Sequence, residues 1–345
     1  MNHNTENQNT QKILITGGVG YIGSTISSVL SDFGYTPIIL DSTKTNLKDF
    51  QNKHILFRGD FSDEDTLKTI FEIHPEISIV IHCAGLTSVP ESMKHPISYY
   101  IENTTKSMNL FRFLSKTGCK KIIYSSSGSI YKSETNRPVK ENDAIDVKSP
   151  YATSKFLTET LLNDFCSSEK MKAIIFRYFN PIGTDPNYRS GPKLNQQNSI
   201  LGKLIEISSQ KKPVFEIMGD SWETSDGTAI RDYIHVWDLA LAHLKAIEKF
   251  DTILGDVNIN NPPNSITLNL GSGIGTTVGE FFNTFKKVSG STMSHKIREP
   301  RPGDVAGAYA NIENAKTILS WHPSLSIDRG IKDALKWAKK IQTPN

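Results

Sequence analysis

Short apolar runs alternate with segments of helical periodicity along the first half of this 345-residue chain. Between the first two runs, apolar residues recur at helical spacing from Ile22 to Phe33, and Gly34 is suited to end that helix. Longer helical stretches are predicted over 96–116 and 151–168. Because strands that alternate with helices form parallel sheets covered on both faces, the pattern predicts an α/β fold with a doubly wound parallel sheet. The runs that predict its strands are 13–15, 37–40, 55–57, 77–81, 121–124 and 173–176.

The pattern changes after Asn180. Residues 181–200 are rich in Pro, Gly, Asn and Gln, which predicts a loop region, and residues 266–270 predict one more strand of the sheet. We therefore expect two domains that are interleaved in the sequence. The expected parts are a disordered tail (1–11), a nucleotide-binding domain (12–180 and about 232–275) and a smaller C-terminal α/β domain for the substrate (181–231 and 276–345).

Composition and charge exclude several classes of protein. Hydrophobic residues make up 37% and charged residues 22%, and the net charge of +3 is dispersed, which argues against a nucleic-acid partner. The three cysteines show no metal-type spacing, so we expect a reducing compartment and no metal site. The polar residues 1–10 do not form a secretory signal, and no apolar run could span a bilayer. A cytoplasmic protein without a membrane partner is the expectation.

A glycine-rich loop, Gly17-Gly-Val-Gly20-Tyr-Ile-Gly23, follows the first predicted strand and opens the first helix. Glycines at these positions permit a tight turn, close approach of the backbone to a pyrophosphate, and close packing of the helix on the strand. Asp41 ends the second predicted strand, where a carboxylate binds the ribose 2′-hydroxyl and repels a 2′-phosphate. The pattern therefore predicts NAD as the cofactor, and Lys44 leaves NADP open as a minor alternative.

Further candidates lie at the carboxyl ends of later strands, where ligands bind in open α/β sheets. Asp60 suits either a cap for the helix expected near Asp63 or a contact with an adenine, and the sequence leaves both open. The predicted cofactor contacts besides the three glycines and Asp41 are Tyr21 and Ile22 in the glycine loop, Asp60 and Phe61 after the third strand, and Ala84 and Gly85 after the fourth.

The segment Ser149-Pro-Tyr151-Ala-Thr-Ser-Lys155 places a tyrosine and a lysine four residues apart on one helix face. Ser149 suits the N-cap and Pro150 the first helical position, so Tyr151 would lie near the positive end of the helix dipole. That dipole and the nearby ammonium of Lys155 both favour the phenolate, which predicts that Tyr151 acts as a base. By itself the Tyr151/Lys155 pair also fits a solvated helix face, so the choice between these two interpretations depends on the rest of the chain.

Three more specific motifs are Arg177-Tyr-Phe-Asn-Pro-Ile-Gly183, Asp226-Gly-Thr-Ala-Ile-Arg-Asp-Tyr-Ile-His-Val236 and Arg301-Pro-Gly-Asp304. With them, the chain from Lys12 to about Trp337 resembles the extended short-chain dehydrogenase/reductase superfamily and, within it, the UDP-glucose 4-epimerase family. The resemblance implies a Rossmann-type sheet with a smaller interleaved C-terminal substrate domain, NAD as cofactor, and inversion at C4 of a UDP-hexose through a 4-keto intermediate.

The resemblance also implies roles for individual residues. Ser127, the last of a serine run, matches the catalytic serine; Tyr151 would take the proton of the sugar 4-hydroxyl, and Lys155 would hold the cofactor ribose. Asn103 and Tyr178 match cofactor-side positions. The residues implied to bind the UDP-sugar, besides Ser127 and Tyr151, are Asn180, Arg231, Arg301 and Asp304, with either Asn198 or Ser199 matching one further asparagine.

Two positions bear on which sugar is used. Thr87 stands where the family often has a lysine, which would loosen the cofactor or shift the sub-family toward epimerases of acetylated or acidic sugars. Ala308 occupies a position that the resemblance identifies as bulky in enzymes restricted to glucose and galactose. Room for a 2-acetamido group is thereby implied, so UDP-GlcNAc and UDP-GalNAc are expected alongside UDP-Glc and UDP-Gal. The family is commonly dimeric through the helices around 96–116 and 151–168, so a homodimer is expected.

Competing functions come from two classes. A sugar-nucleotide 4,6-dehydratase would need an acidic pair just after the catalytic serine, where this chain has Gly128-Ser129. A 4-epimerase or decarboxylase that acts on UDP-glucuronate stays open. The alternative from a different class is a non-catalytic NAD-binding sensor. Such a protein typically loses the base, whereas Ser127, Tyr151 and Lys155 are all present here.

Overall fold

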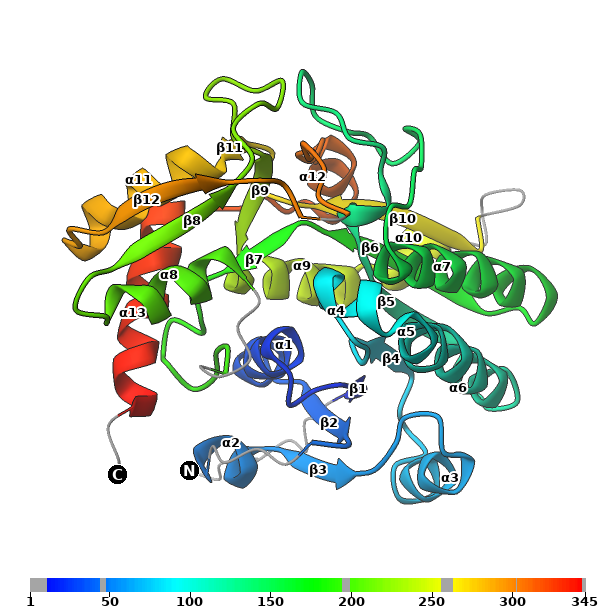
Figure 1. Ribbon diagram of the computed structural model, residues 1–345. Coiled ribbons are helices and arrows are strands. Elements are labelled where there is room, and N and C mark those ends of the chain that lie inside the picture. The colour runs from blue at the N-terminus through cyan, green and yellow to red at the C-terminus, as the bar shows by residue number, and fades with distance from the viewer. Residues whose placement is uncertain (1–10, 44–47, 194–198, 256–262, 302, 343–345) are drawn as a thin grey trace.

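The computed structural model describes residues 11–43, 48–193, 199–255, 263–301 and 303–342 (Figure 1). Within these ranges the central sheet has seven strands, all parallel, in the order β10-β6-β5-β4-β1-β2-β3. The chain winds outward in both directions from β1, which confirms the predicted α/β fold with a doubly wound sheet. The strands are β1 (Lys12–Thr16), β2 (Thr36–Asp41), β3 (Ile55–Arg58), β4 (Ile79–His82), β5 (Lys121–Ser127), β6 (Lys172–Tyr178) and β10 (Ser265–Leu270).

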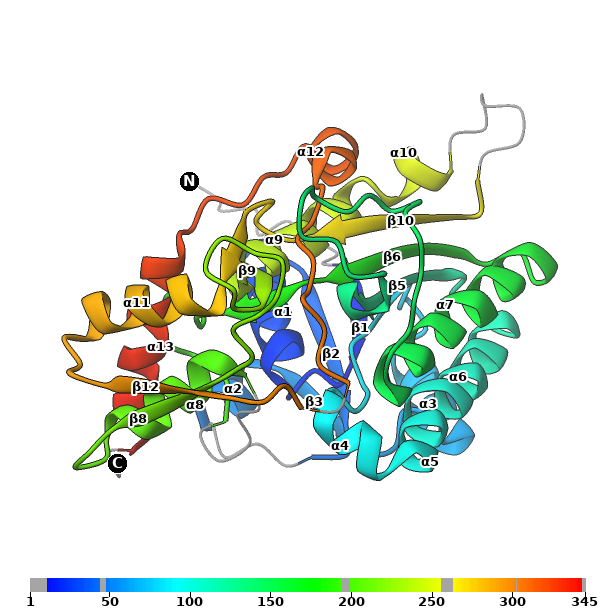
Figure 2. The same cartoon turned by 45° about the horizontal axis from the view of Figure 1, so that its top comes forward.

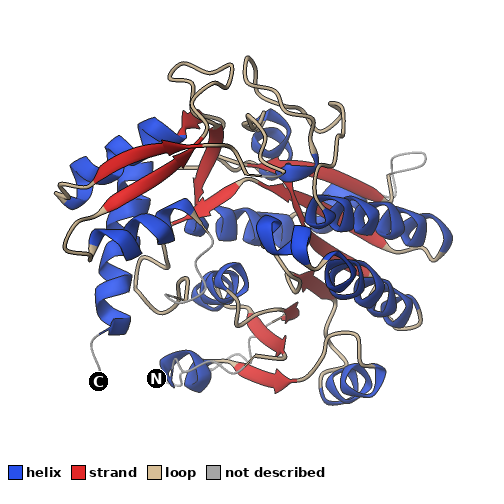
Figure 3. Cartoon of the chain, in the orientation of Figure 1, coloured by secondary structure: helices blue, strands red, loops and turns tan. Residues whose placement is uncertain are grey.

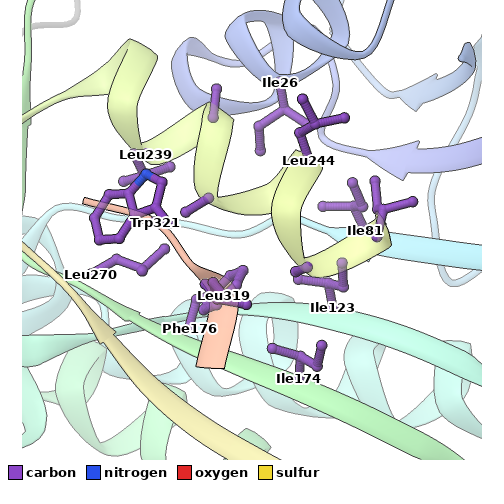
Figure 4. Packing of buried hydrophobic residues seen from close by; sticks show 14 of the residues in the cluster. Ile26, Ile81, Ile123, Ile174, Phe176, Leu239, Leu244, Leu270, Leu319 and Trp321 are labelled. Atoms are coloured by element: carbon purple, nitrogen blue, oxygen red, sulfur yellow. The ribbon is translucent and has the colours of Figure 1, made fainter. Parts of the chain in front are cut away.

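Helices cover both faces of this sheet, which is why its strands are continuous apolar runs (Figure 3). On one face, Ile81, Ile123 and Ile174 of three neighbouring strands pack with residues of α1 (Tyr21–Asp32) and α9 (Val236–Glu248), as Figure 4 shows. On the other face, the alternate residues of the same strands pack on α3 (Glu64–Ile73), α6 (Lys106–Ser115) and α7 (Pro150–Ser168). Because helices cover both faces, the loops that can form a site lie at the carboxyl ends of the strands.

The predicted helix over 96–116 is divided into three pieces. It consists of α5 (Pro96–Tyr99), a π-helical turn η1 (Tyr100–Thr105) and α6. The wide turn places Asn103 in the interior, where it is 2% exposed. Single wide turns of this kind are often found at functional sites, and the apolar periodicity of the sequence does not reveal them.

Apart from α9 and β10, which belong to the central sheet and its cover, much of the chain after β6 builds a second layer to one side of that sheet (Figure 2). Its described strands form one sheet in the order β11-β9-β7 and one in the order β12-β8. They are β7 (Asn180–Ile182), β8 (Val214–Met218), β9 (Ile230–His235), β11 (Gly275–Thr277) and β12 (Ser294–Arg298). Since β7 and the start of α8 (Ile200–Ser208) fall within 180–200, the prediction of a loop over 181–200 was too broad.

A separate apolar core holds this layer together. Phe281, Phe282 and Phe285 of α11 (Val278–Ser289) pack with residues of α8, β8 and α13 (Ile327–Gln342). None of the helices in the described ranges is both long and apolar enough to span a bilayer. The remaining helical segments are α2 (Lys48–Lys53), α4 (Val89–Lys94), the short turn η2 (Gly128–Ile130), α10 (Phe250–Leu254) and α12 (Glu313–Leu319).

Candidate active site

The glycine-rich loop lies at the carboxyl end of β1, in contact with the end of β4. Gly17 has a φ of +71°, and a side chain there would come within 2.7 Å of the Ala84 backbone. A side chain at Gly23 would overlap the carbonyl oxygen of Gly17. Asp41 accepts hydrogen bonds from the backbone N–H groups of Val19 (3.0 Å) and Thr43 (2.8 Å), so its carboxylate lies beside the loop. The glycines therefore let the backbone of the loop turn tightly into the N-terminus of α1, whose first N–H groups suit an anion such as the pyrophosphate of a dinucleotide.

Asn103 shapes the segment that follows β4. Its side-chain oxygen accepts from the Leu86 N–H (2.7 Å), and its amide group donates to the Leu86 carbonyl (3.0 Å) and to Ser154 Oγ (2.9 Å). Gly85, with a φ of +148°, leaves room for this amide. Both N–H groups of Asn103 are therefore used within the protein, and its side chain holds Gly85 and Leu86 in place.

Four other predicted cofactor contacts interact with protein groups. Tyr21 donates through its hydroxyl to the Gly183 carbonyl (2.7 Å), and Ile22 packs on the core. Phe61 packs against the ring of His82. Asp60 forms an ion pair with Lys106 (2.7 Å). Burial is the largest single effect and raises the pKa of Asp60, but the hydrogen bonds from Lys106 and Ser62 and the charge of Lys106 together lower it below its ordinary value.

The N-cap of α3 is Asp63, which accepts from the Thr66 N–H at 3.0 Å, so capping by Asp60 is wrong. Thr87 is exposed, and Lys44 lies outside the described residues.

Ser127, Tyr151 and Lys155 are brought together where β5 ends and α7 begins. Ser149 caps α7 by accepting from the Ala152 N–H (3.2 Å), and Pro150 occupies the first turn, as predicted. Tyr151 therefore lies at the N-terminus of the helix, with its ring edge-on to Tyr99. Burial raises the pKa of Tyr151, while a hydrogen bond with Ser127 lowers it.

Lys155 is bonded to the backbone at the carboxyl end of β5. Its side chain is buried, and its ammonium donates to the Ser125 carbonyl at 2.9 Å. Burial lowers the pKa of Lys155 to about 8. Burial outweighs the hydrogen bond with Ser127 and leaves the pKa of Tyr151 raised, while the Lys155 side chain is held by a backbone carbonyl at the end of β5.

Sequence reasoning missed His243, which fixes the hydroxyl of Tyr178. Burial lowers the pKa of His243 to about 4, so its ring is neutral at pH 7. Its Nδ1 lies 2.9 Å from the Leu239 carbonyl and must carry the proton, so Nε2 accepts from the Tyr178 hydroxyl at 2.6 Å. That hydroxyl also meets Ser125 Oγ at 2.9 Å, so the Tyr178 oxygen is bonded on both sides within the protein. A histidine on an apolar helix carries no sequence signal for this role.

A second group that was missed lies next to Ser127. Arg177 binds Glu159 through Nη2 (2.7 Å) and Nε (3.1 Å), and both side chains are almost completely buried. The guanidinium also donates to Tyr131 Oη and to the Glu141 carbonyl, both at 2.8 Å. Ser126, next to Ser127 in β5, donates to Glu159. The ion pair thus ties β5, β6 and α7 together with the segment that leads from β5 to α7.

The predicted substrate residues come from the second layer. Arg231 donates through Nη1 to the carbonyls of Ile230 (2.6 Å) and Ala306 (3.0 Å), and burial lowers its pKa. Arg301 is exposed and paired with Asp304, with Nε at 3.1 Å from the carboxylate. These two segments lie close enough for the charges of Asp304 and Arg301 to act on Arg231.

The other predicted substrate positions differ in how far the structure describes them. Asn180 is exposed at the start of β7. Ser199 caps α8 by accepting from the Gly202 N–H (3.2 Å), whereas Asn198 lies outside the described residues.

Ala308 belongs to a small apolar cluster near Ser127. It packs with Tyr131, Val139, Phe179, Ala310 and Ile312. The ring of Phe179 also lies against Gly128, the residue after Ser127, where a side chain would come within 2.9 Å of the ring. Through Phe179, this cluster reaches the residue after Ser127, and we call the cluster the wall beside Ser127.

The sequence pattern of the NAD dependent epimerase/dehydratase family matches residues 13–260, and the chain belongs to this family, among its UDP-glucose 4-epimerases. A similar relative is UDP-glucose 4-epimerase of Bacillus subtilis, which is 33% identical over 94% of this chain and 96% of its own length.

Crystal structures support the same assignment. One is UDP-glucose-4-epimerase from Stenotrophomonas maltophila with bound NAD and formylated UDP-arabinopyranose (TM-score 0.88, 28% identity, 96% of this chain and 99% of that one). Another is the UDP-Glc/GlcNAc 4-epimerase from Campylobacter jejuni (TM-score 0.78, 31% identity, 96% of this chain and 99% of that one). The similarity extends over both layers of the structure and not just the nucleotide-binding part.

Proposed function

We propose that this protein inverts C4 of UDP-hexoses and interconverts UDP-glucose and UDP-galactose with NAD as cofactor. The observation that carries the proposal is the meeting of Ser127, Tyr151 and Lys155 where β5 ends and α7 begins, at the carboxyl end of the central sheet. Curated relatives that match nearly the whole chain are UDP-glucose 4-epimerases, which supports the same reaction.

The residues around the glycine loop fit a dinucleotide. Gly17 and Gly23 lack the side chains that would fill the loop, the N-terminus of α1 faces it, and the carboxylate of Asp41 lies at its edge. We assign the pyrophosphate to this loop, the adenosine ribose to Asp41 and the nicotinamide ribose to Lys155. When bound, NAD supplies an acceptor for the hydrogen of C4 and returns it to the opposite face of the sugar.

In the proposed reaction Tyr151 accepts the proton of the sugar 4-hydroxyl and later gives it back. The hydrogen bond with Ser127 assists by lowering the pKa of Tyr151 against the effect of burial. Lys155, with a pKa of about 8, is mostly protonated at neutral pH, so its charge is available to hold a ribose hydroxyl and to favour the phenolate. Arg231 and Arg301 suit the diphosphate, since a guanidinium can bridge phosphate oxygens.

A direct test is to incubate the purified protein with UDP-galactose, with and without added NAD, and to measure UDP-glucose. We expect conversion with no net oxidation. Bound NAD without any UDP-glucose formed would favour a non-catalytic sensor and contradict the proposal. Including UDP-glucuronate, with assays for its 4-epimer and for released carbon dioxide, tests the alternatives left open by the sequence.

We further propose that the enzyme accepts UDP-GlcNAc and UDP-GalNAc. The small side chain of Ala308 in the wall beside Ser127 supports this extension. The similar protein from Campylobacter jejuni is a UDP-Glc/GlcNAc 4-epimerase, which is consistent with the idea. A panel of UDP-hexoses with and without the acetamido group tests it.

We propose a homodimer in the cytosol. Apolar side chains that are unusually exposed gather on α5, η1, α6 and α7, of which α7 lies against both η1 and α6 (Figure 1). They include Ile97 (71% exposed), Ile101, Met108 and Leu157. A contiguous apolar face of this kind is typical of a surface that a second copy covers. The three cysteines are free, which fits a reducing compartment.

A further inference from the structure

The backbone around Ala308 is held from two sides. On one side it follows β9: the Ile230 N–H donates to the Ala306 carbonyl (2.8 Å), and the Ala310 N–H donates to Asp232 (3.0 Å). On the other side it follows the segment between β5 and α7, where the Val139 N–H donates to the Tyr309 carbonyl at 2.8 Å. Residues 306–310 thus join the second layer to the nucleotide-binding part of the chain.

Ser133 makes the contact next to Ala308. Its hydroxyl donates to the Gly307 carbonyl and accepts from the Gly307 N–H, both at 2.9 Å. The Glu134 N–H donates to the same carbonyl at 2.9 Å. One exposed serine side chain therefore binds both polar backbone groups of the residue that precedes Ala308.

Gly307 leaves the backbone little freedom to adapt. Its φ is +113°, and a side chain there would overlap the Ile230 carbonyl and the guanidinium of Arg231. The peptide is close against β9 on one side and bound by Ser133 on the other. The backbone of Gly307 sets the direction of the Ala308 side chain. The contacts of Gly307 with β9 and with Ser133 therefore fix that direction.

We propose that Ser133 is a positioning residue for sugar specificity, because it holds Gly307 and thereby fixes where Ala308 stands in the wall beside Ser127. The proposal rests on the proposed function, in which that wall faces the 2-substituent of the sugar. Without the serine hydroxyl, the carbonyl and the N–H of Gly307 lose their hydrogen bonds to Ser133 and bind solvent instead. Ala308 and the wall then move away from the position that fits an acetamido group. The effect should appear mainly in KM for the acetamido sugar, since Ser133 touches neither Tyr151 nor Lys155.

The test compares the wild-type enzyme with Ser133→Ala, Ser133→Thr and the control Asn136→Ala. Asn136 is exposed in the same segment and is bonded through its backbone N–H, which alanine keeps. For each protein, kcat and KM are measured with UDP-galactose and with UDP-GalNAc. If UDP-GalNAc is not turned over, its inhibition constant against UDP-galactose replaces the second measurement.

We expect Ser133→Ala to raise KM, or the inhibition constant, for UDP-GalNAc by roughly fivefold relative to UDP-galactose, from the loss of two hydrogen bonds. Threonine keeps the hydroxyl and should restore the wild-type ratio, and the control should not change it. A wild-type ratio in Ser133→Ala, or an equal loss for both sugars, would overturn the proposal. Failure of the proposed function is a different result, namely no conversion of UDP-galactose by the wild-type enzyme.

Discussion

Replacing Glu159 with glutamine removes the charge that faces Arg177 in the interior. The two side chains are 4% and 8% exposed, and the guanidinium lies 2.7 Å from the carboxylate. Arginine stays charged at any accessible pH, so it cannot relieve the imbalance by losing its proton. Glutamine also presents a donor in place of one acceptor oxygen. The substitution therefore leaves a buried positive charge without a counter-charge.

The expected loss of unfolding free energy follows from this geometry. Removing one member of a buried ion pair costs about 3–5 kcal/mol. Arg177 keeps its hydrogen bonds to Tyr131 Oη and to the Glu141 carbonyl, both at 2.8 Å, which offset part of the penalty. We therefore expect a loss near the lower limit, about 3 kcal/mol.

Urea denaturation followed by far-UV circular dichroism measures this loss. The matched control is Glu216→Gln, which breaks the pair with Arg298 on the surface, where the arginine and glutamate side chains are 55% and 46% exposed. Exposed pairs contribute about 0–1 kcal/mol, so the control should change little. If both variants lose the same free energy, burial is not what makes the Glu159 pair matter, and the reasoning is refuted.

Four further predictions concern activity, pH and assembly. Tyr151→Phe should lower kcat by about 10²–10⁴-fold while NAD stays bound, and near-normal turnover would exclude Tyr151 as the base. Ala308→Tyr should abolish turnover of UDP-GalNAc and spare UDP-galactose, whereas equal loss of both would count against the role of Ala308.

Burial lowers the pKa of Lys155 to about 8, so between pH 8 and 10 the unfolded state binds more protons. The nucleotide-free wild type should then gain about 2 kcal/mol of stability with rising pH relative to Lys155→Met, and parallel pH curves would contradict this. Ile97→Glu combined with Leu157→Glu should give a monomer in light scattering, and an unchanged mass would place the interface elsewhere.

The order of the elements around the central sheet was predictable because local sequence determines them. Strands buried on both faces must be apolar throughout, so runs such as Ile13 to Ile15 identify them without knowledge of their neighbours. The glycine loop and the start of α7 are equally local, since a glycine at a positive φ and a serine cap act within a few residues. In contrast, the π-helical turn around Asn103 and the short strand β7 depend on neighbours that the sequence does not identify.

The sequence by itself therefore determined the sheet, its helices and the residues that meet at the start of α7. Tertiary structure alone decided how those residues are held: Lys155 bonded to Ser125, Tyr178 to His243, and Ser133 to Gly307, 174 positions away. The physical reason is the distance along the chain over which each kind of interaction acts. Backbone conformation and burial patterns act within a few residues, whereas a hydrogen bond between distant side chains exists only after packing has brought the two groups together.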